Sequence, residues 1–448
     1  MPDSYKFDFD NLRDLRQAAE ENEYKLPVSE KLDFLAREFK VGDRVIPNSL
    51  CVNPMEGRDA DHNGAPSSLT FRKYKRFAAG GAGIIWVEAT AVTPSGKSHP
   101  RQLHINEESL PGFSQLVDEV RETFKKAKGS TQSPLIVLQL THSGRHSAPE
   151  GKLDPIIAKH SRRLDKKYDI PAAYPVISDS QLERIKKGFK SAAKLSLEAG
   201  FDAVDIKSCH GYLLHELLFS YKNPDSKYRG KFSDRTAFLR ELVSEIKDEF
   251  PDLLLASRLS VYDNIPYPDG WGVKKDGKIE PDLSEPFQLI EQLQERGLEI
   301  LNLAFGNPYY DPFLERPYDQ PLVGDEHPGK DPLAAISTNV ELTAKVAREF
   351  PNLVKVGGGF SWLRGFFQNV AAGLKERELL DSIGAGRLAL ADPAFASKII
   401  EGDGLSRDNA CVTCSSCSQM MQDDVEVGCL IRDGEIYRSS YRNGRKMS

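Results

Sequence analysis

Eight short apolar runs alternate along the chain with longer stretches in which apolar residues recur at helical spacing. The apolar runs are Ser49–Asn53, Gly83–Ala89, Pro134–Leu140, Ala203–Lys207, Leu253–Leu259, Leu298–Ala304, Leu353–Val356 and Ile383–Arg387. Such continuous runs are typical of strands that are buried on both faces of a parallel sheet. The stretches between them include Gly112–Lys126, Asp179–Leu197, Asp234–Glu249, Glu285–Arg296, Asn339–Phe350 and Phe360–Ala372. The alternation predicts an α/β fold, a (β/α)8 TIM barrel, with an open doubly wound sheet as the alternative.

The two ends of the chain fall outside this alternation and divide it into three parts. Residues 1–40 are polar, with a helical pattern around Asn11–Tyr24, and we expect an N-terminal helical extension. The barrel is expected over 41–402, and a small cysteine-rich segment over 403–448. Two long connections, His142–Ile177 and Phe305–Ser337, follow the third and sixth strands. In a barrel they would lie over the active site, where long loops usually carry function.

Composition and charge exclude several classes of protein. The 448 residues include 60 Lys and Arg against 66 Asp and Glu, a net charge of −6, which argues against a broad nucleic-acid surface. The sequence contains no apolar run of about 18 residues, so no membrane span is expected. The start of the chain is polar and lacks the apolar core of a secretory signal, and we expect a cytoplasmic protein. A homo-oligomer is compatible with these features.

Glycines and an arginine gather after the last two predicted strands. Gly357-Gly358-Gly359 follows the seventh strand, and Gly384-Ala385-Gly386-Arg387 ends the eighth. Glycines let backbone N–H groups approach a phosphate, and arginine can bind it through two hydrogen bonds. Barrels often bind phosphate at this position. The alternative for each motif alone is a tight turn with a solvated arginine, but together they predict a phosphate site.

Two motifs resemble those of a known family. Leu138–Arg145 (LQLTHSGR) is similar to the third-strand signature of the old yellow enzyme family, and Gly200–Leu214 (GFDAVDIKSCHGYLL) to its fourth-strand signature. The resemblance runs from about Phe39 to Asp433. It implies a barrel that binds FMN and catalyses a flavin-dependent redox reaction.

The resemblance assigns flavin-binding roles residue by residue. It implies that Pro54, Met55 and Glu56 border the flavin, that Ala89 leaves room for its ring, and that Gln139 binds its pyrimidine edge. Arg258 would lie near N1 and O2, where its charge stabilises the anion that forms on reduction. Gly358, Gly359, Gly386 and Arg387 would hold the phosphate.

The same resemblance implies an ene-reductase chemistry. Tyr212 would protonate the substrate carbon, and His210 and Lys207 would bind the carbonyl oxygen, while hydride passes from FMN N5 to the other carbon. The substrate would be an enone, an enoate or an enoyl thioester. Lys207 replaces a histidine and Glu56 replaces a threonine or cysteine of many members, and the two could form an ion pair. The alternatives are an amine dehydrogenase and a non-catalytic electron-transfer subunit.

Four cysteines lie close together after the last predicted strand. The spacing Cys411-x2-Cys414-x2-Cys417-x11-Cys429 suits a [4Fe–4S] cluster held by four thiolates, with zinc or free thiols as alternatives. A similar stretch follows the barrel in trimethylamine dehydrogenase and 2,4-dienoyl-CoA reductase, members of the same family. No second nucleotide-binding motif follows Cys429. We therefore expect electrons to pass between the cluster and a separate redox partner: a ferredoxin, a flavoprotein or an NAD(P)H-oxidising subunit.

Overall fold

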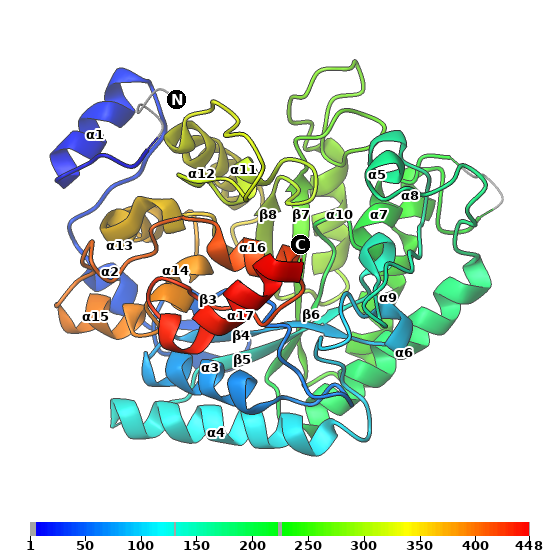
Figure 1. Cartoon of the computed structure of the whole chain (residues 1–448), viewed down its shortest axis with the longest axis horizontal. Coiled ribbons are helices and arrows are strands. Elements are labelled where there is room, and N and C mark those ends of the chain that lie inside the picture. Colours follow the sequence, from blue (N-terminus) through cyan, green and yellow to red (C-terminus); the bar gives the residue numbers. More distant parts are fainter. Residues whose placement is uncertain (1–5, 130, 223–225, 448) are drawn as a thin grey trace.

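The computed structural model describes residues 6–129, 131–222 and 226–447, and its centre is a closed barrel of eight parallel strands (Figure 1). The strands are β3 (Leu50–Val52), β4 (Ile84–Ala91), β5 (Leu135–Thr141), β6 (Ala203–Ile206), β7 (Leu254–Tyr262), β8 (Ile300–Phe305), β9 (Val354–Gly357) and β10 (Ser382–Ala385). β10 pairs in parallel with both β9 and β3, which closes the ring. The predicted barrel is confirmed, and the open sheet is wrong.

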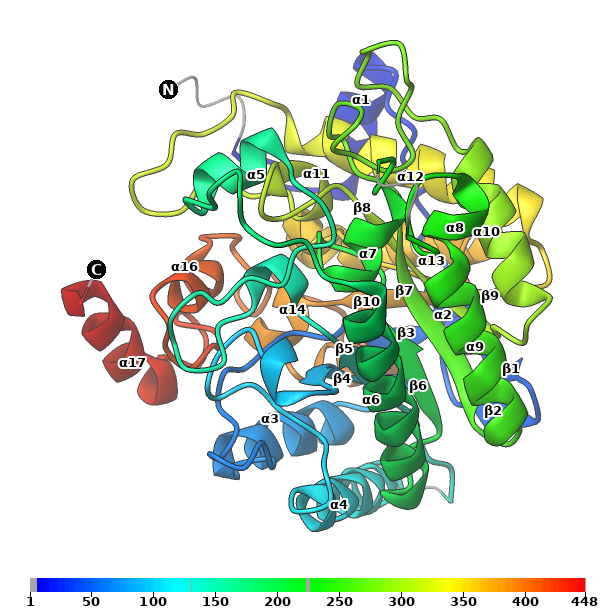
Figure 2. The ribbon, with the colours of Figure 1, turned by 90° about the vertical axis from the view of Figure 1, so that its right-hand side faces the viewer.

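Helices surround the strands in the order expected of a (β/α)8 barrel (Figure 2). The outer ring comprises α3 (Ser68–Ala79), α4 (Leu110–Lys128), α6 (Asp179–Glu198), α9 (Ala237–Glu249), α10 (Ser284–Gln294), α12 (Pro332–Glu349), α13 (Phe367–Glu376), α14 (Arg387–Ala391) and α15 (Phe395–Glu401). α3 and α6 each begin with a capping box, in which Ser67 or Ser178 binds the backbone three residues on. The expected helix over Phe360–Ala372 is divided into a 3-10 segment, η4 (Ser361–Phe366), and α13, and Arg364 within η4 adopts a non-helical φ of +50°.

The N-terminal part closes one end of the barrel. α1 (Leu12–Glu21) is capped by Asn11, as the helical pattern predicted, and α2 (Asp33–Ala36) follows. β1 (Phe39–Val41) and β2 (Arg44–Ile46) then form an antiparallel hairpin. Val41 and Ile46 are buried against the first inward-facing side chains of the barrel strands, including Trp86. The apolar hairpin therefore covers the N-terminal end of the barrel and leaves the opposite end for a site.

Shorter helices lie in the loops that follow the strands at their C-terminal ends. They are α5 (Arg162–Lys167) after β5, α7 (Leu213–Leu218) and α8 (Phe232–Arg235) after β6, and α11 (Pro312–Glu315) after β8. The two long predicted connections therefore contain α5 and α11. None of the helices in the described part of the chain could span a membrane.

The C-terminal segment contains α16 (Ser416–Gln422) and α17 (Gly434–Met447), which contact each other (Figure 1). Met420, Val427 and Tyr437 form a small apolar core of their own. Asp433 anchors the segment to α3, because its two carboxylate oxygens each accept a hydrogen bond of 2.8 Å from Arg72. Arg76 lies 2.5 Å from the same carboxylate.

Candidate functional site

A tight turn after β6 gathers the three side chains predicted to be catalytic. His210 and Gly211 both adopt left-handed backbone conformations, with φ of +64° and +71°. Glycine accepts this conformation freely, whereas histidine is strained by it, as often happens at functional sites. The turn leaves Lys207, His210 and Tyr212 buried, with 6%, 9% and 3% of their surfaces exposed. All three therefore lie together at the C-terminal end of the barrel.

Tyr212 lies in a buried, polar and partly cationic environment. Its hydroxyl oxygen is 3.2 Å from that of Tyr309, and Lys207 Nζ lies 3.8 Å from the centroid of its ring. Burial raises the pKa of Tyr212 well above its usual value, and the nearby Glu56 carboxylate adds to the shift. The phenol is therefore protonated at neutral pH and can donate a proton.

His210 and Arg258 meet at one carboxylate. His210 Nε2 lies 2.6 Å and Arg258 Nη2 lies 3.0 Å from Oε1 of Glu315, which ends α11. Burial lowers the pKa of His210 to about 4, so its imidazole is neutral at pH 7. Burial opposes ionisation of Glu315, but His210 and Arg258 outweigh it and lower its pKa to about 2. Glu315 thus fixes the ring of His210 and partly neutralises Arg258.

Glu56 and Lys207, the two departures from the family pattern, lie near each other. Burial lowers the pKa of Lys207, and Glu56 is among the groups that oppose this shift. The carboxylate of Glu56 is instead bound by Gln102 Nε2 at 2.8 Å and Ser98 Oγ at 3.2 Å. Glu56 therefore acts on Lys207 through its charge, while Gln102 and Ser98 hold it in place.

The remaining predicted ring-binding residues line the same end of the barrel. Gln139 Nε2 donates a 2.6 Å hydrogen bond to Asp205, which also accepts one of 2.9 Å from Trp86 Nε1. Burial raises the pKa of Asp205. Ala89 is buried on β4, and its carbonyl oxygen accepts a 2.9 Å hydrogen bond from Gln102. The segment Pro54–Glu56 follows β3 directly and is largely buried.

The predicted phosphate residues meet where β9 and β10 end. A side chain at Gly358 would lie 2.4 Å from Asn53 Nδ2, and Gly359 adopts φ +93°, so both positions require glycine. A Cβ at Gly386 would lie 3.1 Å from Met55 Sδ, which joins this site to the Pro54–Glu56 segment. Because these residues are glycines, backbone without side chains lies at the end of the barrel beside Arg387.

Two buried guanidinium groups lie beside these glycines. Arg387 Nη2 donates to the carbonyl oxygen of Pro317 at 2.7 Å. Its Nη1, and Nη1 of the nearby Arg316, have no hydrogen-bond partner in the part of the chain that the structure describes. The charge of Arg387 and burial together lower the pKa of Arg316. A buried pair of cations with unused donors is suited to a phosphate dianion.

The four cysteines of the C-terminal segment line one small pocket together with Arg387. Burial raises the pKa of Cys411 to about 12, and the charge of Arg387 opposes the shift. Among the described residues, no three His, Cys, Asp or Glu side chains converge closely enough to hold a single metal ion.

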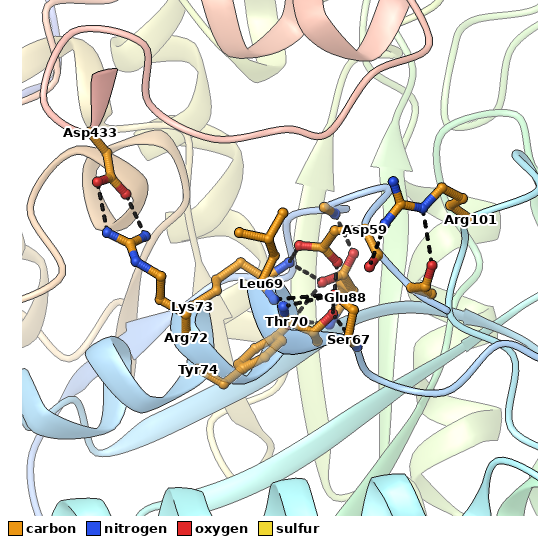
Figure 3. Close-up of polar contacts among 12 residues, drawn as sticks. Asp59, Ser67, Leu69, Thr70, Arg72, Lys73, Tyr74, Glu88, Arg101 and Asp433 are labelled. Carbon is orange, nitrogen blue, oxygen red and sulfur yellow. Dashed lines mark hydrogen bonds and ion pairs between the residues drawn. The ribbon is translucent and has the colours of Figure 1, made fainter. Parts of the chain in front are cut away.

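A second charged cluster comprises Lys73, Glu88 and Asp59, as Figure 3 shows. Lys73 of α3 contacts the carboxylate of Glu88 and lies 3.5 Å from Asp59 Oδ2, and all three side chains are buried. The backbone N–H of Gly57 donates to Glu88. The carbonyl oxygen of Gly57 accepts a 2.8 Å hydrogen bond from Val427 of the cysteine segment.

Several residues of the site could not be identified from the sequence. Tyr309 and Glu315 lie in the connection Phe305–Ser337, which was expected to cover the active site, but nothing distinguishes them from its other aromatic and acidic residues. His146 stacks on Tyr309 with ring centroids 3.8 Å apart. The charged cluster at Lys73 was also missed, because α3 was not among the predicted helices.

Comparison with known proteins identifies the family. The family model described as "NADH:flavin oxidoreductase / NADH oxidase family" matches residues 35–303. The chain is 31% identical over 215 residues to an NADPH dehydrogenase of Clostridium acetobutylicum, covering 48% of this chain and 59% of that protein. It is 28% identical over 272 residues to an NADPH dehydrogenase of Bacillus subtilis, covering 60% of this chain and 71% of that one. The match thus spans less than two thirds of the first relative.

Solved structures of low identity share the fold. A 2-naphthoyl-CoA reductase in complex with 2-naphthoyl-CoA superposes with a TM-score of 0.70 at 18% identity, covering 89% of this chain and 57% of that one. The amine oxidase HisD of Pseudomonas geniculata N1 gives 0.69 at 19% identity, covering 92% and 56%. The old yellow enzyme homologue of Zymomonas mobilis gives 0.60 at 18% identity, covering 84% and 94%. With the barrel and the family match in agreement, the chain belongs to the NADH:flavin oxidoreductase / NADH oxidase family, the flavin-dependent oxidoreductases of old yellow enzyme type.

Proposed function

We propose that the protein is an FMN-dependent ene-reductase that reduces the activated C=C bond of an enone, an enoate or an enoyl thioester. The observation that carries this proposal is the buried phenol of Tyr212, which burial keeps protonated beside the cation of Lys207. A protonated phenol is a competent acid toward a carbanion that forms next to a carbonyl group.

The residues present fit FMN, which supplies a hydride when it is bound in its reduced form. The unused nitrogens of Arg387 and Arg316 and the bare backbone at Gly358 and Gly359 suit its phosphate. Arg258, in the middle of β7, supplies positive charge where the ring is expected. The segment Pro54–Glu56, together with Ala89, Gln139 and Gly386, completes the proposed cofactor site.

The chain's own groups would perform the acid–base part of the reaction. Lys207 would donate a hydrogen bond to the substrate carbonyl oxygen, and the neutral His210 would share its one N–H between Glu315 and this oxygen. Their donation stabilises the negative charge that develops on this oxygen. Tyr212 then gives its proton to the adjacent carbon, and Tyr309, whose hydroxyl lies 3.2 Å away, can return a proton to Tyr212.

Replacement of Tyr212 by phenylalanine tests the proposal. Tyr212→Phe should slow reoxidation of the reduced flavin by 2-cyclohexenone about 100- to 10,000-fold, while reduction of the flavin is unchanged. Tyr309→Phe removes the neighbouring hydroxyl alone and should have a smaller effect, which makes it the matched control. Reoxidation of the Tyr212→Phe protein at the parent rate would refute the role of Tyr212.

A second candidate, an amine dehydrogenase, is favoured by two contacts. Glu315 lies 2.6 Å from His210, so a carboxylate accompanies the histidine and tyrosine. The rings of His146, Tyr309 and Tyr212 lie within 6.2 Å of one another by centroid, and aromatic faces attract cations. The cationic Lys207 at the ring of Tyr212 opposes the binding of a protonated amine. Turnover of trimethylamine or histamine with an artificial electron acceptor, and none with an enone, would favour this candidate; turnover of neither would favour a non-catalytic electron-transfer subunit.

For the C-terminal segment, residues 403–448, we propose a [4Fe–4S] cluster held by Cys411, Cys414, Cys417 and Cys429. The four cysteines line one pocket, and although burial raises the pKa of Cys411, the adjacent charge of Arg387 opposes this shift and so supports thiolate ligands. The cluster would exchange electrons with a separate redox partner, a ferredoxin, a flavoprotein or an NAD(P)H-oxidising subunit. Iron and sulfide analysis of anaerobically purified protein tests this proposal; zinc, or no metal, would refute it.

A further inference from the structure

A short basic segment overlies the tyrosine pair of the proposed active site. Residues 159–167 contain five Lys or Arg and one Asp, in a chain whose net charge is −6. Within α5, Arg162, Arg163, Lys166 and Lys167 are exposed. The acidic residue of the helix, Asp165, is already engaged by the buried Arg145 and by His160 at 2.7 Å. The basic segment therefore presents its positive charge to solvent.

This segment is attached to the site through direct contacts. Lys167 Nζ donates a 2.6 Å hydrogen bond to the carbonyl oxygen of Tyr309, whose hydroxyl faces Tyr212. Tyr168, which directly follows α5, packs edge-on against His146 with ring centroids 5.3 Å apart, and His146 stacks on Tyr309. The exposed cations thus lie on a helix that contacts the residues around Tyr212.

The charge pattern works against the helix that carries it. Arg162 and Lys166 are four residues apart, as are Arg163 and Lys167, and like charges at this spacing destabilise a helix. Arg162 and Lys166 form no ion pair with any residue that the structure describes. A pattern that weakens the local fold and leaves two cations without an ion pair among the described residues is explained by attraction of an anion.

We propose that Arg162, Arg163, Lys166 and Lys167 bind the phosphate-bearing tail of a small molecule whose reactive end would reach Tyr212. The inference rests on the proposed function for the position of the reactive end. Two sources supply such a tail: a nicotinamide dinucleotide that reduces the flavin, and a thioester substrate on a phosphorylated carrier. Both molecules carry an adenosine phosphate that is remote from their reacting group.

Binding of two adenosine bisphosphates tests the proposal without any need for turnover. Adenosine 2′,5′-bisphosphate represents NADPH, and adenosine 3′,5′-bisphosphate represents coenzyme A. We expect calorimetry on the flavin-loaded protein at low ionic strength to detect one of them. The variant Arg162→Glu/Lys166→Glu should weaken this binding at least about tenfold, and added salt should reduce the difference.

The matched control is Lys125→Glu/Lys126→Glu on α4. These lysines are also exposed and lie in the last turn of their helix, and Figures 1 and 2 place α4 on the side of the molecule opposite α5. The control should bind the probe as the parent does. Absence of binding of both probes to the parent, or an equal loss in the two variants, would overturn the proposal. Either result leaves the test of Tyr212 unaffected, so the two proposals can fail separately.

Discussion

Replacement of Lys73 by methionine gives a test of the buried charge cluster that does not depend on any cofactor. The lysine is 5% exposed, and it is shared between Glu88, which it contacts, and Asp59, whose carboxylate oxygen lies 3.5 Å away. Both carboxylates are 1% exposed. Methionine fills much of the same space but removes the cation, so Lys73→Met leaves two buried acidic groups without a counter-charge.

The geometry gives the expected size of the effect. At 3.5 Å and an effective dielectric constant of about 20, one ion pair is worth about 5 kcal/mol. The orphaned carboxyl groups can take up protons, which limits the loss. Removing one partner from a buried pair typically lowers the free energy of unfolding by about 3–5 kcal/mol, and we expect a loss in this range at pH about 8.

The loss should depend on pH in a defined direction. Burial already raises the pKa of Glu88 to about 7, against the opposing charge of Lys73, and removal of Lys73 raises it further. A carboxyl group whose pKa is higher in the folded than in the unfolded state takes up a proton on folding, so stability increases as the pH falls toward about 4.5. Urea denaturation followed by tryptophan fluorescence should therefore show a smaller difference from the parent at pH about 5.5 than at pH about 8.

Lys75 on the same helix provides the control. It forms an ion pair of 2.8 Å with Glu119, but its side chain is 48% exposed. Exposed pairs contribute at most about 1 kcal/mol, so Lys75→Met should change the unfolding midpoint little. Equal losses in the two variants, or a loss in Lys73→Met that does not change with pH, would refute the argument from burial.

Two further substitutions test the proposed cofactor sites, and a third tests how the cysteine segment is anchored. Arg387→Ala should lower the FMN content of purified protein and weaken FMN binding in fluorescence titrations, because it removes a buried cation with an unused donor; unchanged affinity would contradict the proposed phosphate site. Cys417→Ser should lose iron but keep flavin, as measured by metal analysis and absorbance, and retention of full iron would contradict its role as a ligand. Asp433→Asn should destabilise the cysteine segment and accelerate its proteolysis, because two arginines, Arg72 and Arg76, lose their shared counter-charge; proteolysis at the parent rate would show that the anchor is dispensable.

The barrel could be predicted because each strand is a continuous apolar run that must be buried on both faces. α3 escaped prediction for the opposite reason. In the sequence, Lys73 indicates a position that faces solvent. Its burial is favourable only because the fold brings the carboxylates of Asp59 and Glu88 to it. Sequence periodicity therefore describes apolar burial well and paired polar burial poorly.

The site shows the same limit. Motif residues such as Tyr212 could be found because the turn after β6 keeps them close in sequence. Glu315, which contacts His210 and Arg258, is 105 residues from His210 and lies in a connection without a recognisable pattern. The contact depends on where α11 is folded over the barrel, and this position is set by tertiary packing.

The two proposed cofactor sites share one stretch of backbone, and this has a physical consequence. Gly57 follows the segment that would border the flavin; its N–H is held by Glu88, and its carbonyl oxygen by the backbone of Val427, two residues before Cys429. Arg58 contacts Asp424 of the same C-terminal segment. The cysteine segment is therefore hydrogen-bonded to the loop after β3, and the ion pair of Glu88 with Lys73 holds the same loop from the side of α3. Because the hydrogen-bonded partners are buried and cannot be replaced by water, ordering one site favours order in the other.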